Sequence, residues 1–134
     1  MNLNNFTIKS QEAIQRGQQI AMEREHQAIE PAHIMKGIFE IDENVTPFIL
    51  NKLGVNIKNL KQSLDSMIQS YPLVKGGEQY LSKSGNEVLQ KANSYLKEFG
   101  DQYVALELLV LALLKTKDKV SEMLKDKGIN EKDL

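Results

Sequence analysis

Cysteine is absent from the sequence, and basic residues are not in excess over acidic ones. Without cysteine the chain has no disulfide framework and no thiolate metal site, which fits a reducing cytosol. Its 134 residues carry a formal net charge of −1 at pH 7. Because binding to duplex nucleic acid needs a basic face that neutralises many phosphates, we expect no nucleic-acid partner.

Long apolar runs are missing as well. The longest, from Tyr103 to Leu114, is interrupted by Glu107 and is far shorter than the ~20 residues of a membrane-spanning helix. The first residues show no basic stretch followed by an apolar run, so no secretory signal is recognisable. We therefore expect a cytoplasmic protein with no membrane partner. Hydrophobic residues make up 41% and charged residues 26% of the chain, as in an ordinary globular domain.

A short phrase occurs twice in the sequence. Residues 54–60 read GVNIKNL, and residues 128–134 read GINEKDL. Because each copy of a duplicated unit this small cannot bury an adequate core alone, the copies should pack together, with a groove at their seam. The recurrence predicts one domain, 1–134, divided into repeat one at 1–70, a linker at 71–80 and repeat two at 81–134.

Apolar residues at helical spacing predict two long amphipathic helices, one in each copy. The first runs from about Phe6 to Arg24. In the second, Ser84 and Glu87 form an S-x-x-E capping box, and Gly100 provides the C-terminal cap. The apolar stripes are Ala13, Ile14, Gly17, Ile20 and Ala21 in the first helix, and Val88, Leu89, Ala92, Tyr95, Leu96 and Phe99 in the second.

Shorter helices are expected between and after these two. Pro31 stands in the first turn of one of them, where its missing amide hydrogen costs nothing. Its counterpart in the second copy, 106–115, is apolar on nearly every side, so both should lie centrally. Thr46 followed by proline is typical of a cap that opens another short helix, which Gly54 closes; residues 120–127 are its counterpart.

A fourth helix should begin after Asn56 and stop near Tyr71-Pro72, because proline restrains the residue before it. Asn130 should open the duplicate of this helix, but the sequence ends at Leu134, in its first turn. We therefore expect the natural protein to continue. The linker contains Gly76-Gly77 and no apolar period, so it should be exposed.

Two histidines, His26 and His33, lie among three glutamates and on paper could form a metal cluster. A metalloprotease motif needs two histidines four apart on one helical face, whereas here a helix-starting Pro31 intervenes. We expect no metal and interpret both as solvated or capping side chains. A small metal-dependent hydrolase is the remaining enzymatic alternative, which stoichiometric zinc in the purified protein would support. No nucleophile motif or phosphate loop is present, so we predict no catalytic residue and no enzyme activity.

Several stretches together resemble a known family. Thr7, the run QAIEPAHIM at 27–35, Tyr71-Pro72, GDQYV at 100–104 and Glu107-Leu108 resemble the amino-terminal (Clp repeat) domain of bacterial ClpB-type AAA+ disaggregase chaperones. The resemblance covers essentially the whole chain. IEPAHIM separates it from the ClpA and ClpC relatives, which usually have G-T-E-H there. The resemblance implies an all-α domain of eight helices in two pseudo-twofold-related four-helix repeats, with the last helix truncated here.

The resemblance also implies a function. In the family this domain is non-catalytic, engages unfolded or aggregated polypeptide weakly through an apolar groove, and passes it to the ATPase ring of a hexamer. ATP and Mg belong to ATPase modules outside this chain, which itself should hold no cofactor. A DnaK-type chaperone system is the implied partner of the parent protein. The alternative is an adaptor-docking module, as in ClpA- and ClpC-type unfoldases.

Family positions linked to function correspond to Thr7, Asp101 and Glu107 here. Each also has a structural explanation: Thr7 as a helix cap, Glu107 beside the positive end of a helix dipole, and Asp101 as a turn residue. Lys91 stands where the family usually has an apolar residue, which reduces the expected groove. The remaining groove candidates are Ala13, Gly17, Tyr95 and Leu108.

Overall fold

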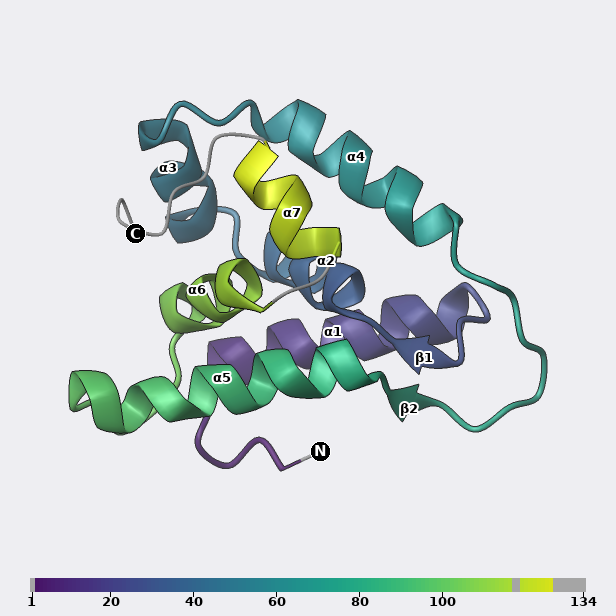
Figure 1. The fold of residues 1–134 in the computed structure, drawn as a ribbon, viewed down its shortest axis with the longest axis horizontal. Coiled ribbons are helices and arrows are strands. Elements are labelled where there is room, and N and C mark those ends of the chain that lie inside the picture. Colours follow the sequence, from purple (N-terminus) through teal and green to yellow (C-terminus); the bar gives the residue numbers. More distant parts are fainter. Residues whose placement is uncertain (1, 117–118, 127–134) are drawn as a thin grey trace.

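The computed structural model describes residues 2–116 and 119–126, which form an all-α fold as predicted. Figure 1 shows α2 and α6 at the centre, α1 and α5 along one side, and α3, α4 and α7 along the other. Within the described residues the only sheet is the pair of two-residue strands. The elements are α1 (Ile8–Glu23), β1 (Ala28–Ile29), α2 (Pro31–Ile41), α3 (Val45–Lys52), α4 (Ile57–Gln69), β2 (Tyr80–Leu81), α5 (Lys83–Phe99), α6 (Leu106–Lys115) and α7 (Lys119–Asp126).

The core is built around α2 and α6, whose central position is confirmed. In α2, the apolar residues Ile34, Met35, Ile38 and Phe39 are all buried. The α6 helix spans the residues that the sequence predicts, and among its apolar residues only Leu108 and Leu111 are partly exposed. The long helices α1 and α5 bury the predicted stripes against this centre, except that Leu96 is half-buried and Phe99 is exposed.

Two glycines allow α1 and α2 to pack with their backbones in contact. A Cβ atom on Gly17 would lie 2.8 Å from the carbonyl oxygen of His33, and one on Gly37 would overlap the carbonyl oxygen of Ala13. Any larger side chain at either position would push the two helices apart. Because α1 packs this closely on α2, the α2 helix lies deep in the fold.

Two predicted caps are wrong by a few residues. The N-cap of α5 is Ser82, whose hydroxyl accepts a hydrogen bond from the Gly85 amide at 2.9 Å, so Ser84 lies inside the helix. At α3 the cap is the carboxylate of Asp42, and Thr46 lies in the first turn. A carboxylate reaches farther than a hydroxyl, which lets Asp42 serve from before the N-cap position.

Other helix ends follow the sequence. Thr7 caps α1 by accepting from the Ser10 amide at 3.1 Å, and Asn56 caps α4 by accepting from the Asn59 amide at 3.1 Å. Gly54 and Gly100 follow α3 and α5 with φ values of 78° and 71°, the left-handed conformation that favours glycine. The expected Gly128 cap and the eighth helix after Asn130 lie outside the described residues.

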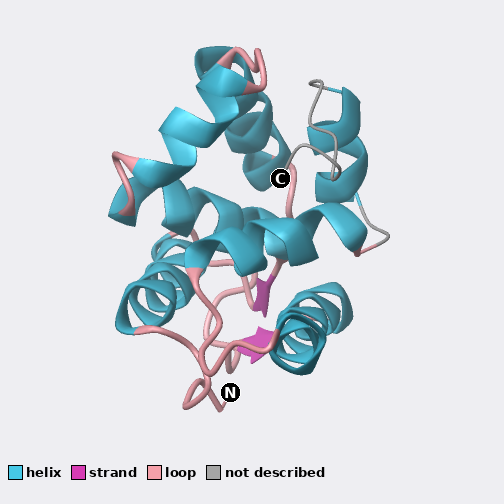
Figure 2. Ribbon diagram, turned by 90° about the vertical axis from the view of Figure 1, so that its left-hand side faces the viewer, coloured by secondary structure: helices cyan, strands magenta, loops and turns pink. Residues whose placement is uncertain are grey.

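The linker is more ordered than its glycines suggest. Tyr80 and Leu81 pair in parallel with Ala28 and Ile29, and the Val74 amide donates to the Glu25 carbonyl at 2.8 Å. Figure 2 views α1 and α5 nearly end-on, with the two strands between them. Residues 72–78 are all exposed as expected, but Val74 and Tyr80 attach the linker to the segment between α1 and α2. Two-residue strands carry no alternation that a sequence pattern could reveal.

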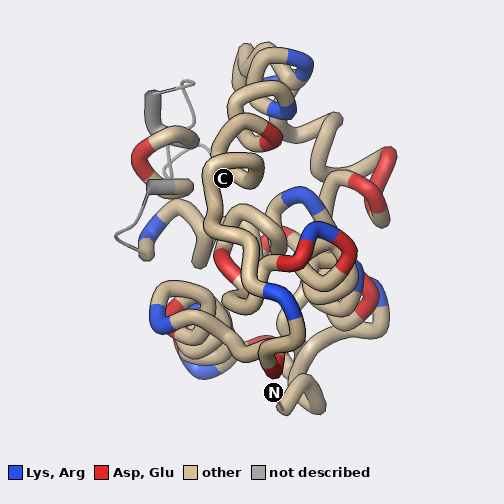
Figure 3. Tube along the Cα trace, turned by 90° about the vertical axis from the view of Figure 1, so that its right-hand side faces the viewer, with Lys and Arg blue, Asp and Glu red and all other residues tan. Residues whose placement is uncertain are grey.

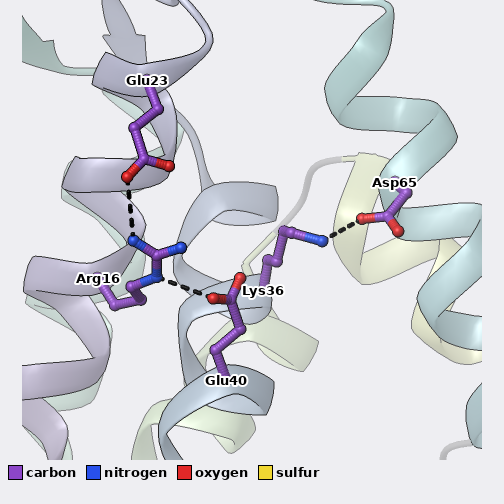
Figure 4. A network of polar contacts seen from close by, with 5 residues as sticks. All are labelled: Arg16, Glu23, Lys36, Glu40 and Asp65. Atoms are coloured by element: carbon purple, nitrogen blue, oxygen red, sulfur yellow. Dashed lines mark hydrogen bonds and ion pairs between the residues drawn. The ribbon is translucent and has the colours of Figure 1, made fainter.

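Ion pairs cross the interfaces of α2 on its outer side (Figure 4). Arg16 on α1 bonds to Glu40 on α2 at 2.8 Å, and Lys36 on α2 pairs with Asp65 on α4. All four side chains are partly exposed, so each pair contributes about 1 kcal/mol or less. The apolar core, rather than these pairs, sets the helix arrangement. No helix among the described residues has the length and apolar character needed to cross a bilayer.

Candidate functional site

The three residues that the family resemblance links to function lie around one junction between the start of the chain and the connection from α5 to α6. Phe6 and Val104 form a parallel β-bridge. The Thr7 amide donates to the Val104 carbonyl at 3.0 Å, and the Val104 amide donates to the Asn5 carbonyl at 2.7 Å. Because Asp101 and Glu107 flank Val104 in sequence, the junction places all three residues at the same end of the domain.

Thr7 has a clear structural role at this junction. Besides capping α1, its hydroxyl donates to the Ser10 hydroxyl at 2.9 Å, and Ser10 is buried. Losing a cap of this kind typically costs about 1 kcal/mol. Thr7 therefore fixes both the start of α1 and its attachment to Val104.

Asp101 and Glu107 are both exposed. The Asp101 amide donates to the Leu96 carbonyl at 3.0 Å and helps end α5 after Gly100. Glu107 stands in the first turn of α6, near the positive end of the helix dipole. It also borders a narrow crevice against α3, lined with Thr46, Ile49, Leu50 and Val110. The side chains of Asp101 and Glu107 are therefore accessible to solvent and to a partner, whereas the side chain of Ser10 is buried.

The groove candidates are mostly covered. Ala13 and Gly17 are buried in the contact between α1 and α2, Tyr95 is buried in α5, and Leu108 is half-buried on α6. Tyr95 packs beside Phe99, with ring centres 5.5 Å apart. Direct contact of Ala13 or Gly17 with a client would require these helices to separate, so their role in binding stays a prediction.

A hollow of about 490 Å³ lies beside α5 and the end of α6. Two of its lining residues are lysines, Lys91 and Lys115, and the Lys115 ammonium lies 6.0 Å from the centre of the Tyr95 ring. All six residues that line the hollow are polar or charged. It is lined with Glu87, Gln90, Lys91, Ser94, Lys115 and Thr116, all from the second predicted repeat rather than from the seam.

Exposed apolar side chains beside the junction were not singled out from the sequence. Ile8, which follows Thr7, is 76% exposed, and Tyr103, which precedes Val104, is 54% exposed. Phe99 at the end of α5 is also exposed, although helical spacing places it on the buried stripe. A signal existed for Ile8, since it lies out of phase with the α1 stripe.

The two histidines form a buried pair, so the interpretation of His26 as a solvated side chain is wrong. The Nδ1 atom of His26 lies 2.9 Å from Nε2 of His33, and the Glu30 amide donates to Nδ1 of His33 at 2.9 Å. His33 thus caps α2, as one alternative proposed. The sequence pattern did not predict this contact, because His26 lies before β1 and His33 lies in α2, so the two do not share a helical face.

Burial lowers the pKa of both imidazoles. The pKa of His33 falls from 6.5 to about 4 through its burial, aided by the neighbouring His26 and Arg24 charges. The pKa of His26 falls through burial and the Arg24 charge. The pair is therefore neutral at pH 7. Within the described part of the chain, no three potential metal-ligating side chains gather, and the two facing ring nitrogens of the pair already bond to each other.

The family model described as the Clp repeat (R) N-terminal domain matches residues 5–127. The chain belongs to this family. Among curated Clp relatives, the ClpB chaperone of Bacteroides thetaiotaomicron is 54% identical over 134 residues, which is 100% of this chain and 16% of that protein. The chain thus spans about a sixth of the length of such a relative.

Solved Clp N-terminal domains share the fold at low identity. The Hsp104 N-terminal domain from Candida albicans has a TM-score of 0.85 and 18% identity, covering 97% of this chain and 86% of that one. A ClpV N-domain in complex with a VipB peptide has a TM-score of 0.79 and 18% identity, covering 100% of this chain and 87% of that one. These likenesses confirm the all-α architecture of the Clp N-terminal domain.

Proposed function

We propose that this domain is the non-catalytic client-engaging domain of a ClpB-type disaggregase, which binds unfolded or aggregated polypeptide weakly. The observation that carries the proposal is full-length similarity of the chain to the start of ClpB chaperones. The peptide complex of a ClpV N-domain with the same fold supports a polypeptide ligand. The ATP-driven hexamer, its Mg and ATP, the DnaK-type partner and the cytoplasmic location belong to the same proposal for the parent protein.

The binding surface we assign to this function is the junction surface, defined by Thr7, Ile8, Asp101, Tyr103 and Glu107. Its two large apolar side chains, Ile8 and Tyr103, each adjoin one member of the hydrogen-bonded Thr7 and Val104 pair. Exposed apolar side chains on a rigid support are the usual anchors for an extended chain. The two carboxylates beside them favour client segments that carry basic residues.

Binding should be weak, because ordering a flexible client offsets much of what a small apolar surface gains. We expect micromolar or weaker affinity, and nanomolar affinity for an unfolded protein would contradict the proposal. The test is NMR titration of the 134-residue chain with a reduced and alkylated, permanently unfolded protein. Shifts should concentrate at residues 6–8 and 99–108.

A matched pair of double variants tests the surface. Replacing Ile8 and Tyr103 with serine should weaken binding about tenfold, equivalent to about 1.4 kcal/mol. The control replaces Val45 and Phe48 on α3, which are 45% and 59% exposed, and should leave binding unchanged. Equal losses of affinity in the two variants would show that any exposed apolar side chain contributes to binding and that the junction surface has no special role.

The adaptor-docking alternative predicts a different result in the same titration. If the unfolded protein shifts no resonance at residues 6–8 and 99–108, docking of a folded partner at another surface would be favoured. Intact dispersion of the core resonances in every variant would exclude unfolding as the cause of lost binding.

A further inference from the structure

The hydrogen bonds around His33 fix the protonation state of the buried pair. Nδ1 of His33 accepts from the Glu30 amide, so the ring proton of neutral His33 lies on Nε2 and points at Nδ1 of His26. Nδ1 of His26 must then accept. Both bonds exist together only when the two imidazoles are neutral.

A proton on either Nδ1 atom breaks this arrangement. On His26 it would set two N–H groups against each other across 2.9 Å. On His33 it would displace the Glu30 amide and put a cation in the first turn of α2, near the positive end of the helix dipole. Protonation therefore breaks the hydrogen bonds of the pair, in addition to placing a charge on a buried ring.

The pair is connected to the linker in two ways. The Tyr71 ring packs on both imidazoles, with ring centres 5.6 Å from His26 and 5.3 Å from His33. The residues on either side of His26 hold the linker backbone: the Glu25 carbonyl accepts from Val74 at 2.8 Å, and the Gln27 carbonyl accepts from Tyr80 at 2.9 Å. A shift of His26 thus moves both acceptors at once.

The attachment is also conformationally strained. Glu25 has a φ of 57°, in the left-handed region that non-glycine residues rarely adopt. Strain of this kind costs of order 1 kcal/mol or more and persists only while the surrounding contacts hold it. Loss of the histidine contact would allow Glu25 to relax, which removes the acceptor for Val74.

The charges that face the pair come from each neighbouring element. Arg24 at the end of α1 disfavours protonation of both rings, and Glu30 before α2 borders the same hollow as His26. Tyr71 follows α4 and Tyr80 belongs to β2, and both also line this hollow of about 220 Å³, which leads from His26 to the surface. Figure 3 faces this side of the molecule, where segments of both charge signs lie along the chain.

We propose that His26, His33 and Tyr71 form a pH-operated latch that holds the 71–80 linker against β1, and that acid releases the linker while the helical core stays folded. Once released, each imidazole regains its ordinary pKa near 6.5. Below that pH the opening equilibrium rises about tenfold per pH unit for each histidine that titrates.

Amide hydrogen exchange by NMR on the 134-residue chain tests the latch between pH 7.5 and 5. After correction for intrinsic exchange rates, protection of the Val74 and Tyr80 amides should fall by more than tenfold per pH unit below pH 6.5. Protection of core amides in α6, such as Leu113, should stay well above that of Val74 and Tyr80 at every pH, because these core amides exchange only on global unfolding. Equal protection at all three amides would mean that they exchange by global unfolding, and no loss at Val74 and Tyr80 would mean no latch.

Variants separate the histidine contact from general acid effects. His26→Asn keeps an acceptor close to the Nδ1 position without a titrating ring, so the pH dependence should fall to about tenfold per pH unit or less. Arg24→Gln should raise the pKa of both rings only in the latched state, so it should leave the onset of opening near pH 6.5 unchanged, because the released imidazoles set that onset. Lys75→Gln removes a linker charge that does not face the pair and should shift nothing. His33→Gln removes the other titrating ring, so an unchanged pH dependence in His33→Gln would overturn the proposal even if His26→Asn fails to fold.

Discussion

Asp42 is a single buried carboxylate that holds the start of α3. It accepts the amide hydrogens of Asn44, Val45 and Thr46 at 3.0, 2.9 and 2.8 Å, and the Thr46 hydroxyl at 2.8 Å. Burial alone would raise the pKa of Asp42, but the bonds from Thr46, Asn44 and Val45 lower it overall. The folded state therefore stabilises the ionised form.

We expect Asp42→Ala to lower the free energy of unfolding by about 2 kcal/mol, since three amide groups lose their acceptor. Urea denaturation at pH 7 measures the change. Asn44→Ala is the matched control, because Asn44 occupies the N-cap position without a side-chain cap bond and should change the value by about 0.5 kcal/mol or less. Equal effects of the two substitutions would contradict this role for Asp42.

At this scale the sequence predicts what is local and misses what is not. Thr7 and Asn56 bond to amides within the next turn, so their type and position suffice to predict their caps. His26 and His33 meet only because α1 and α2 converge, and a one-dimensional pattern holds no record of that angle. Asp101 and Glu107 were singled out through family resemblance rather than through their own chemistry, and the structure places them at the junction surface.

Among the elements, the contact between α1 and α2 depends on the absence of two side chains. Gly37→Ala would place a methyl group against the Ala13 carbonyl and near the Gly17 amide, both backbone groups that cannot rotate away. We expect a loss of about 3 kcal/mol in the free energy of unfolding.

Gln15→Ala is the control for this substitution. Gln15 is exposed on α1, the helix that Gly37 of α2 contacts, and its replacement should change stability by about 0.5 kcal/mol or less. Thermal and urea unfolding of both variants provide the comparison. A Gly37→Ala variant as stable as the parent chain would mean that the two helices can separate at little cost, which would also reopen a binding role for Ala13 and Gly17.

The helices were predictable because each is long enough to show a 3.6-residue period. The α6 bounds follow from an apolar run, and those of α2 from Pro31 and the stripe behind it. The strands were not predictable, because two residues cannot show a period of two. Phe99 was wrongly predicted to be buried for a related reason. It is the last residue of α5 and keeps the helical spacing of the buried stripe, but the elements that cover the stripe do not extend over it.

Across the whole molecule, the histidine pair makes stability depend on pH. The pKa of His33 is about 4 in the folded state and near 6.5 when unfolded, so the unfolded chain binds more protons below pH 6.5. The contribution of His33 to the free energy of unfolding is fully present above pH 6.5 and declines as the pH falls towards 4. Between pH 7.5 and 5.0 we expect a loss of about 2 kcal/mol from His33 alone.

Urea denaturation at the two pH values measures this loss. His33→Gln should be less stable at pH 7.5, because the Glu30 amide loses its acceptor, but should lose much less on acidification. Carboxylates such as Asp42 act in a lower range, below their ordinary pKa of 3.8, and do not obscure the comparison. Identical stabilities of the parent chain at pH 7.5 and 5.0 would contradict the neutral buried pair.

The bridge between Phe6 and Val104 also affects when the domain can form during synthesis. The partner of the first segment leaves the ribosome nearly a hundred residues later, so at ~5–20 residues per second the first segment waits on the order of 5–20 s. During that interval Phe6, one of the most buried side chains of the finished domain, has no place to pack. A domain for which we propose the binding of unfolded chains thus begins its synthesis with an exposed phenylalanine of its own.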